Sequence, residues 1–105
     1  MNIIEINKSL IPYDFNISLG GELFNLRIDY NRTGDFFTAE LSKGGETLCA
    51  GEPIIYGKTL FADIRKSNFP KVNITPLDPS ETYSAVTYEN LSESVLLIVE
   101  EIAEE

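Results

Sequence analysis

The 105-residue chain contains no histidine, no tryptophan and a single cysteine, Cys49. Without histidine it lacks the commonest general base, the usual partner of a catalytic serine and a frequent zinc ligand. One cysteine supports neither an intrachain disulfide nor a structural zinc site. Because no histidine or basic residue adjoins Cys49 in the sequence, we predict a small buried thiol rather than a reactive one.

The 17 acidic residues are the remaining candidates for catalysis. None lies within an apolar run that would favour its protonated form, and a small domain without tryptophan has little room for a sugar-binding cleft. The acids do not follow the spacing of a calcium-binding loop, and the glycine doublets are unlike a phosphate-binding loop. We therefore predict no enzyme activity, no catalytic residue, no cofactor and no metal site.

Positive charge is missing from the end of the chain. Residues 1–71 contain nine acidic and eight basic residues, whereas residues 72–105 contain eight acidic residues and no lysine or arginine. The net charge of −9 argues against a nucleic-acid partner, because a phosphate backbone needs a basic face. We interpret the acidic end as a solvated surface, and a docking strip is the alternative that the sequence leaves open.

Long apolar runs are also absent. The longest, Val95 to Val99, is far shorter than the ~20 residues of a membrane-spanning helix, so no membrane insertion is expected. The first residues lack the basic stretch and apolar run of a signal peptide, which predicts synthesis and retention in a cytoplasm.

The composition that is present, 43% hydrophobic and 24% charged, is typical of a folded globular domain. A chain of this length supports one hydrophobic core. We therefore expect a single β-domain over residues 1–105, with an acidic end at 100–105 that frays.

The apolar residues recur with a period of two, which is the signature of half-buried strands. Residues 13–19 alternate strictly, and residues 22–30 alternate again after Gly20-Gly21. A glycine pair adopts positive φ at little cost and suits a two-residue hairpin turn. Residues 13–30 are therefore predicted to form a β-hairpin.

Two further strands are predicted at 36–42 and 47–50, separated by a turn at Gly44-Gly45. Gly51-Glu52-Pro53 is expected to break the second of them, and residues 54–56 to resume it. A glycine at such a place usually marks a bulge or a bend, which curls a small sheet.

The second half of the chain predicts fewer elements. Residues 59–69 fit either a short helical turn or an irregular crossing. Residues 72–77 alternate and predict a strand at a sheet edge or strand end, because Pro76 cannot donate to a ladder. Residues 78–81 predict either a turn or the opening of one helical turn, with Asp78 as the cap.

Residues 82–91 predict no regular structure. The apolar run from Val95 to Val99 predicts a strand buried on both faces, with a helix over 92–101 as the alternative. The fold class is thus all-β: a small curled antiparallel sheet, or a barrel or sandwich, of about six to seven strands built from hairpins.

Eleven aromatic residues are more than the alternating strands account for. Tyr56, Tyr83 and Tyr88 fall near predicted strand ends or loops, where a tyrosine ring can serve as an interface anchor. Packing over a strand end is the alternative for each. These three tyrosines are the candidate interface residues, and a small carbohydrate- or peptide-binding module that uses them is an alternative function.

The order of the elements resembles the small baseplate plug proteins of contractile-tailed phages and prophage-derived tail particles. The resemblance is carried by the hairpin at Gly20-Gly21, the Phe36-Phe37 pair and a G-x-P-[IL]-x-x-G-x-x-L passage. That passage reads Gly51-Glu52-Pro53-Ile54-Ile55-Tyr56-Gly57-Lys58-Thr59-Leu60. The resemblance covers residues 1–77, and the apolar run at 95–99 is similar to the closing strand of that family.

The resemblance implies a non-enzymatic structural component at the centre of a tail baseplate. Its partners would be hub, spike or tube proteins, and association with further copies of itself is left open. The resemblance also implies assembly in a bacterial cytoplasm and a place in the mature virion or tail particle. It carries over no functional residue.

Overall fold

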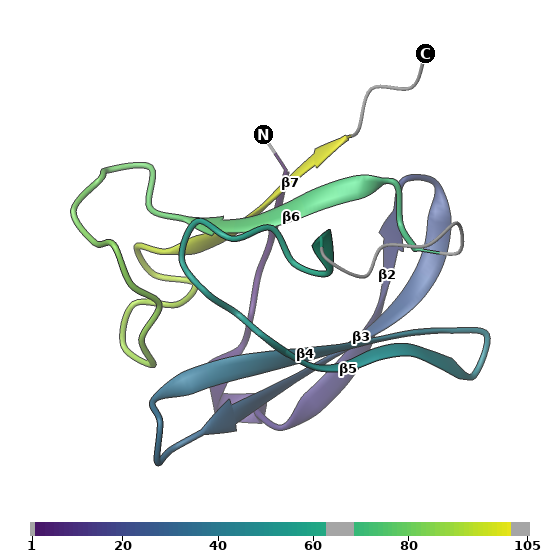
Figure 1. The fold of residues 1–105 in the computed structure, drawn as a ribbon, viewed down its shortest axis with the longest axis horizontal. Helices are drawn as coiled ribbons and strands as arrows, with labels where there is room; N and C mark the ends of the chain where they lie inside the picture. The colour runs from purple at the N-terminus through teal and green to yellow at the C-terminus, as the bar shows by residue number, and fades with distance from the viewer. Residues whose placement is uncertain (1, 63–68, 102–105) are drawn as a thin grey trace.

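A computed structural model describes residues 2–62 and 69–101 of the chain. Strands dominate it, and they form two antiparallel sheets that face one another (Figure 1). The strands and one 3-10 helix are β1 (Asn2–Ile4), η1 (Lys8–Leu10), β2 (Tyr13–Leu19), β3 (Glu22–Asn31), β4 (Phe36–Lys43), β5 (Glu46–Pro53), β6 (Val72–Leu77) and β7 (Leu96–Glu101). The larger sheet has the order β2-β3-β4-β5, and the smaller has the order β1-β7-β6.

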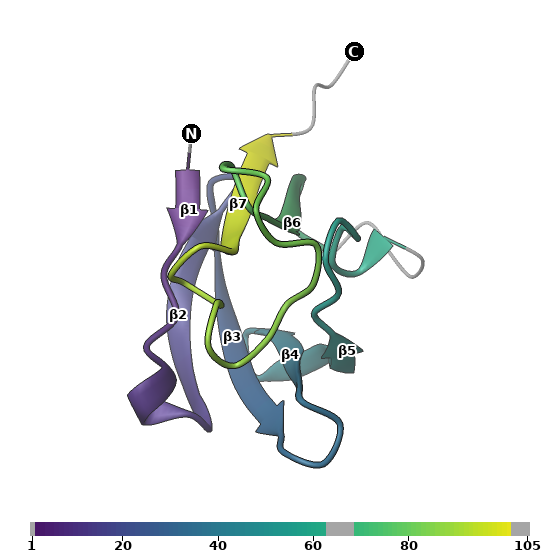
Figure 2. The same ribbon diagram turned by 90° about the vertical axis from the view of Figure 1, so that its left-hand side faces the viewer.

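Both sheets are open and do not close into a barrel (Figure 2). Of the curled sheet, barrel and sandwich that the sequence left open, the structure has two separate layers. One hydrophobic core fills the space between the layers. The larger sheet contributes Phe24, Leu26, Ile28, Phe37, Ala39 and Leu41, and the smaller contributes Ile4, Val72, Ile74 and Leu97. The predicted all-β fold class is confirmed.

The predicted hairpin over residues 13–30 is confirmed as β2 and β3, with Leu19 opposite Glu22 at the turn. Gly20 and Gly21 have φ of 61° and 85°, so both turn positions have the backbone conformation that favours glycine. The β4–β5 hairpin turns in the same way at the second glycine doublet. Period-two alternation places one set of side chains in the core and leaves the outer face of the sheet polar.

Strand β5 corrects one prediction. The expected break at 51–53 and the resumed strand at 54–56 are wrong, because β5 runs unbroken from Glu46 to Pro53. The register shifts from Leu41 opposite Cys49 to Ala39 opposite Glu52, so two residues of β5 face one of β4. Gly51 has a φ of 72° in this β-bulge, which takes up the extra residue without ending the strand.

The smaller sheet confirms the predicted strand at 72–77, which is the edge strand β6. The loop after β5 lies along its outer side, where Gly57 N donates to Pro76 O at 2.8 Å and Leu60 N to Ile74 O at 2.8 Å. These bonds satisfy edge carbonyls that would otherwise face solvent. Of the 59–69 stretch left undecided by the sequence, residues 63–68 lie outside the described residues.

Strand β7 is the central strand of the smaller sheet, so the helix alternative for 92–101 is wrong. Successive residues of a strand point to opposite faces, and Leu97 and Ile98 are both buried, as predicted for a strand covered on both sides. β1 pairs with its other edge, with Asn2 opposite Val99. No strand was predicted there, because three residues are too short to establish a period.

None of the helical elements in the described part of the chain has the length and apolar character required to span a membrane.

Candidate interaction site

The three candidate tyrosines occupy different environments. Tyr56 is half-buried, and its hydroxyl oxygen accepts a 3.1 Å hydrogen bond from Asp78 N. Tyr83 is 47% exposed and Tyr88 is 42% exposed, both on the long loop between β6 and β7. Of the three, Tyr88 alone lines a hollow on the described surface that Arg32 also lines. Tyr56 thus fixes the chain locally, whereas the other two present ring surface to solvent.

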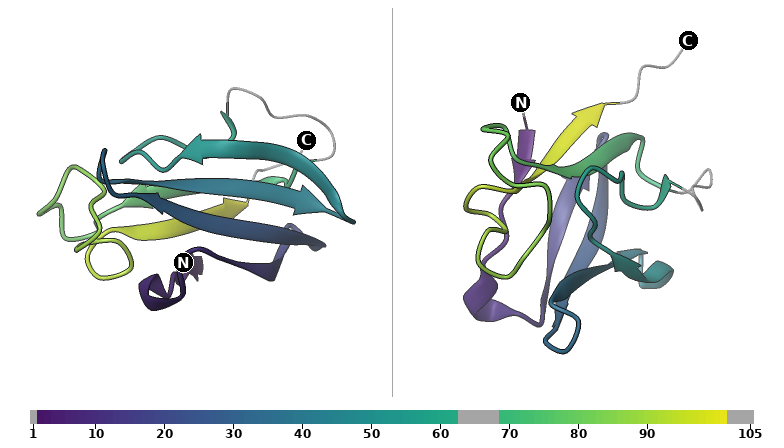
Figure 3. Two further views of the ribbon diagram at one scale, coloured as in Figure 1. Left: turned by 90° about the horizontal axis from the view of Figure 1, so that it is seen from below. Right: turned by 60° about the vertical axis from the view of Figure 1, so that its left-hand side comes forward.

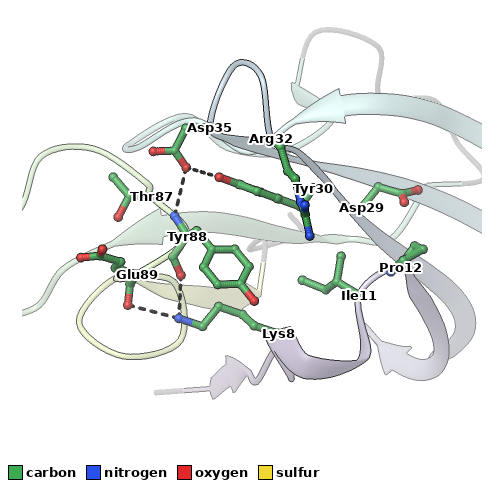
Figure 4. A pocket seen from close by; sticks show the side chains of 10 residues that line it. All are labelled: Lys8, Ile11, Pro12, Asp29, Tyr30, Arg32, Asp35, Thr87, Tyr88 and Glu89. Carbon is green, nitrogen blue, oxygen red and sulfur yellow. Dashed lines mark hydrogen bonds between the residues drawn. The ribbon is translucent and has the colours of Figure 1, made fainter.

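Tyr88 is held firmly despite its exposure. Its ring centroid lies 4.9 Å from that of Tyr30 and 6.0 Å from that of Phe37, with which it is stacked at 10°. Lys8 Nζ lies 5.3 Å from the ring centroid of Tyr88 and donates to the carbonyl oxygens of Tyr88 at 2.6 Å and Glu89 at 3.1 Å. Figure 4 shows the Tyr30 and Tyr88 rings and the two hydrogen bonds of Lys8 beside the hollow.

Asp35 joins this cluster to the turn between β3 and β4. Its Oδ1 accepts a 2.6 Å hydrogen bond from the Tyr30 hydroxyl and a 3.3 Å bond from Tyr88 N. The hydrogen bond from the Tyr30 hydroxyl stabilises the neutral phenol and raises the pKa of Tyr30 above its ordinary value, and partial desolvation adds to the shift. Three chain segments thus meet at one point: η1, the β3–β4 turn and the loop at 87–90.

The hollow between these segments has a volume of about 840 Å³ and opens to solvent. Its lining mixes charged groups with ring and aliphatic surface: Lys8, Ile11, Pro12, Asp29, Tyr30, Arg32, Asp35, Thr87, Tyr88 and Glu89. In Figure 4 the Arg32 side chain points into the hollow, and the Glu89 carboxylate points away from it.

Two side chains shape the loop that carries Tyr83 and Tyr88. Asp78, 4% exposed, accepts four hydrogen bonds: from the backbone N–H groups of Ser80, Thr82 and Tyr83, and from the Ser80 hydroxyl. These bonds lower the pKa of Asp78, and the bond from the Ser80 hydroxyl contributes most. Burial acts in the opposite direction but is outweighed. The predicted capped turn at 78–81 is thereby confirmed.

Asn90 does the same at the other end of the loop. Its side-chain oxygen accepts from Thr87 N at 2.8 Å, and its amide nitrogen donates to Ala85 O at 2.9 Å. The loop at 82–91 has no helix or strand, as predicted. The side-chain hydrogen bonds of Asn90 to Thr87 and Ala85 nevertheless fix the backbone around Tyr88.

Two features that catalysis often uses are a metal-binding cluster and a reactive cysteine. The described residues contain no group of three or more histidine, cysteine or acidic side chains placed to hold a metal ion. Cys49 is half-buried, and burial, with the nearby Glu52 charge, raises the pKa of its thiol, which disfavours the nucleophilic thiolate.

Of the residues that line the hollow, sequence reasoning selected Tyr88 as a candidate and did not select Lys8, Arg32 or Asp35. Arg32 and Asp35 lie in a stretch that reads only as a turn, and Lys8 lies 80 residues before the carbonyl that it binds. No local pattern brings these residues together.

Fold and site together define a small two-sheet β-domain with an aromatic, charged hollow at the junction of three segments. Over residues 1–102, the chain matches the model of the family described as Cyanophage baseplate Pam3 plug gp18. The chain belongs to this baseplate plug family, a family of structural phage baseplate components. The match confirms the resemblance seen in the sequence and extends it through the acidic stretch after residue 77. No curated protein matches the chain.

Proposed function

We propose that this protein is a non-enzymatic plug of a phage or prophage tail baseplate that acts through contacts with hub, spike or tube proteins. The family match over residues 1–102 carries the proposal. The half-buried thiol with a raised pKa and the lack of a metal-binding cluster among the described residues agree with it. Assembly would take place in the bacterial cytoplasm, and the mature protein would be part of the virion or tail particle.

The described surface offers two kinds of contact. Strand β5 is the last strand of its sheet, and its outer side has no strand neighbour in the described part of the chain (Figure 3). An edge strand of this kind can pair with a strand of another chain. The second kind is the loop between β6 and β7, which exposes Tyr83 and Tyr88 beside acidic side chains. Aromatic rings held in fixed positions are typical interface anchors.

Co-expression with hub, spike and tube proteins from the same genome tests the proposal. We expect co-elution with a hub, spike or tube protein in size-exclusion chromatography at physiological salt. Failure to associate with any of them would contradict the proposal. Saturable binding in a glycan array by a chain that ignores all tail proteins would instead favour the carbohydrate-binding alternative.

A further inference from the structure

We infer that the hollow beside Tyr88 docks a segment of a partner protein that presents a carboxylate next to an apolar side chain, with Arg32 binding the carboxylate. The inference rests on the proposed function, because it names the chemistry of the partner segment at this surface.

Arg32 is the cation of the hollow that the fold itself does not use. Lys8 is engaged by two backbone carbonyls. Arg27, two residues before Asp29 on β3, pairs with that carboxylate at 3.1 Å. Arg32 makes no hydrogen bond or ion pair with another described residue, and its side chain points into the hollow (Figure 4). A planar guanidinium can bind a carboxylate through two parallel hydrogen bonds.

The acidic side chains around the hollow do not compete for Arg32. Asp29 is bonded to Arg27, and Asp35 accepts two hydrogen bonds from Tyr30 and Tyr88. The Glu89 carboxylate points away (Figure 4). Their charges nevertheless repel a polyanion, and a nucleic acid would need several cations where the hollow offers one unengaged arginine. The electrostatics therefore fit a single carboxylate.

The apolar part of the hollow defines the neighbour of that carboxylate. Ile11, Pro12 and the exposed face of Tyr88 line it. Because Tyr88 is already held by Tyr30, Phe37 and Lys8, binding would order little new structure. The volume of about 840 Å³ lies within the roughly 300–1,000 Å³ of typical ligand pockets, so a side chain and an adjacent carboxylate can enter together.

An array of short synthetic peptides tests the inference without any tail protein. Each peptide carries one Asp, Glu or terminal carboxylate beside Leu or Phe, and its matched partner carries the amide. The full chain is applied as wild type, Arg32→Gln, Arg32→Lys and Lys58→Gln. Lys58 is exposed and does not line the hollow, so its variant loses the same charge elsewhere. Because Arg32 makes no hydrogen bond or ion pair with another described residue, its variants should unfold at the wild-type urea midpoint at neutral pH.

We expect wild type and Lys58→Gln to retain the same carboxylate peptides and to lose them when the carboxylate becomes an amide. For a retained peptide, Arg32→Gln should raise Kd about tenfold to a hundredfold in fluorescence anisotropy, the loss typical of a charged hydrogen-bonded pair. The Kd of Arg32→Lys should lie between those of wild type and Arg32→Gln, because lysine keeps the positive charge but cannot form the bidentate pair.

No carboxylate-dependent retention, or equal Kd values for Arg32→Gln and Lys58→Gln, would overturn the inference. The co-expression experiment separates it from the proposed function. If Arg32→Gln still binds the tail proteins, the hollow is not the docking site, whereas the plug function stands. Peptide binding without any tail-protein association would preserve the hollow and contradict the plug function.

Discussion

The Tyr30 hydroxyl donates a 2.6 Å hydrogen bond to Asp35 Oδ1, and the same oxygen accepts from Tyr88 N, 53 residues further along the chain. One carboxylate thus fastens the end of β3 to the turn that follows it and to the loop between β6 and β7. Since Tyr30 and Tyr88 also pack ring to ring, the bond fixes the exposed aromatic surface beside the hollow. The shape of the candidate interaction surface therefore follows from hydrogen bonds and ring contacts within the fold.

Replacing Tyr30 with Phe should make stability less sensitive to alkaline pH. The folded pKa of Tyr30 lies above its ordinary value of 10.0, so its contribution is fully present below pH 10 and is lost as pH rises through the folded value. Urea unfolding of wild type and Tyr30→Phe from pH 7 to 11 measures the difference. The two curves should converge at the alkaline end, and a constant gap would contradict the Tyr30–Asp35 bond as its cause.

Replacing Asp78 with Asn should lower stability at neutral pH, because the four donors are shared between both carboxylate oxygens. An amide keeps one acceptor oxygen, and its NH2 group would leave two of the donors without an acceptor. The folded pKa of Asp78 lies below its ordinary value of 3.8. Its contribution is therefore present above pH 3.8 and is lost as pH falls through the folded value. Urea midpoints from pH 7 to 2 should show the gap between the variant and wild type closing in acid. Glu93→Gln, at an exposed position, is the control and should show no comparable gap.

Tyr88 and Tyr83 should differ in how much each contributes to stability. Tyr88→Ala removes a ring packed on two others and should lower the free energy of unfolding by about 2–3 kcal/mol, less than a fully buried aromatic because the ring is half-exposed. Tyr83→Ala should change it by no more than about 0.5 kcal/mol. Urea denaturation followed by circular dichroism provides the test. Equal effects of the two substitutions would contradict the packed role assigned to Tyr88.

Gly51 should be required for its backbone conformation and not for space. Its φ is 72°, and a Cβ added there would meet no atom within 4 Å. Gly51→Ala should therefore cost about 1–2 kcal/mol from left-handed backbone strain alone. Gly51→Asn should cost less, because asparagine tolerates this region. Denaturant unfolding of both variants makes the comparison, and an alanine variant as stable as wild type would contradict the bulge geometry.

Much of the architecture was predictable from local pattern. The alternation over 13–19 and 22–30 and the glycine doublet between them determine a hairpin, because the side-chain period and the turn conformation agree. The apolar run before Glu100 indicated a strand covered on both faces. Gly51-Glu52-Pro53 misled because a glycine and a proline usually end a strand, whereas a bulge here carries β5 on to Pro53.

The candidate site was only partly predictable, and the reason is physical. Tyr88 could be selected as a ring outside the alternating strands, but nothing near it in sequence indicates that Tyr30, Phe37 and Lys8 surround it. Arg32 reads as an ordinary turn residue. Its significance depends on which acids are already bonded and on which way its side chain points, and both are properties of the folded chain.

By itself, the sequence determined the all-β class, the hairpins and the shortage of catalytic groups, because strand periodicity, glycine turns and residue types are local properties. The tertiary structure alone decided that the strands form two open sheets and that Lys8, Asp35 and Tyr88 meet. Such contacts join residues 53 and 80 positions apart, and they form only when burial of the shared core brings distant segments together.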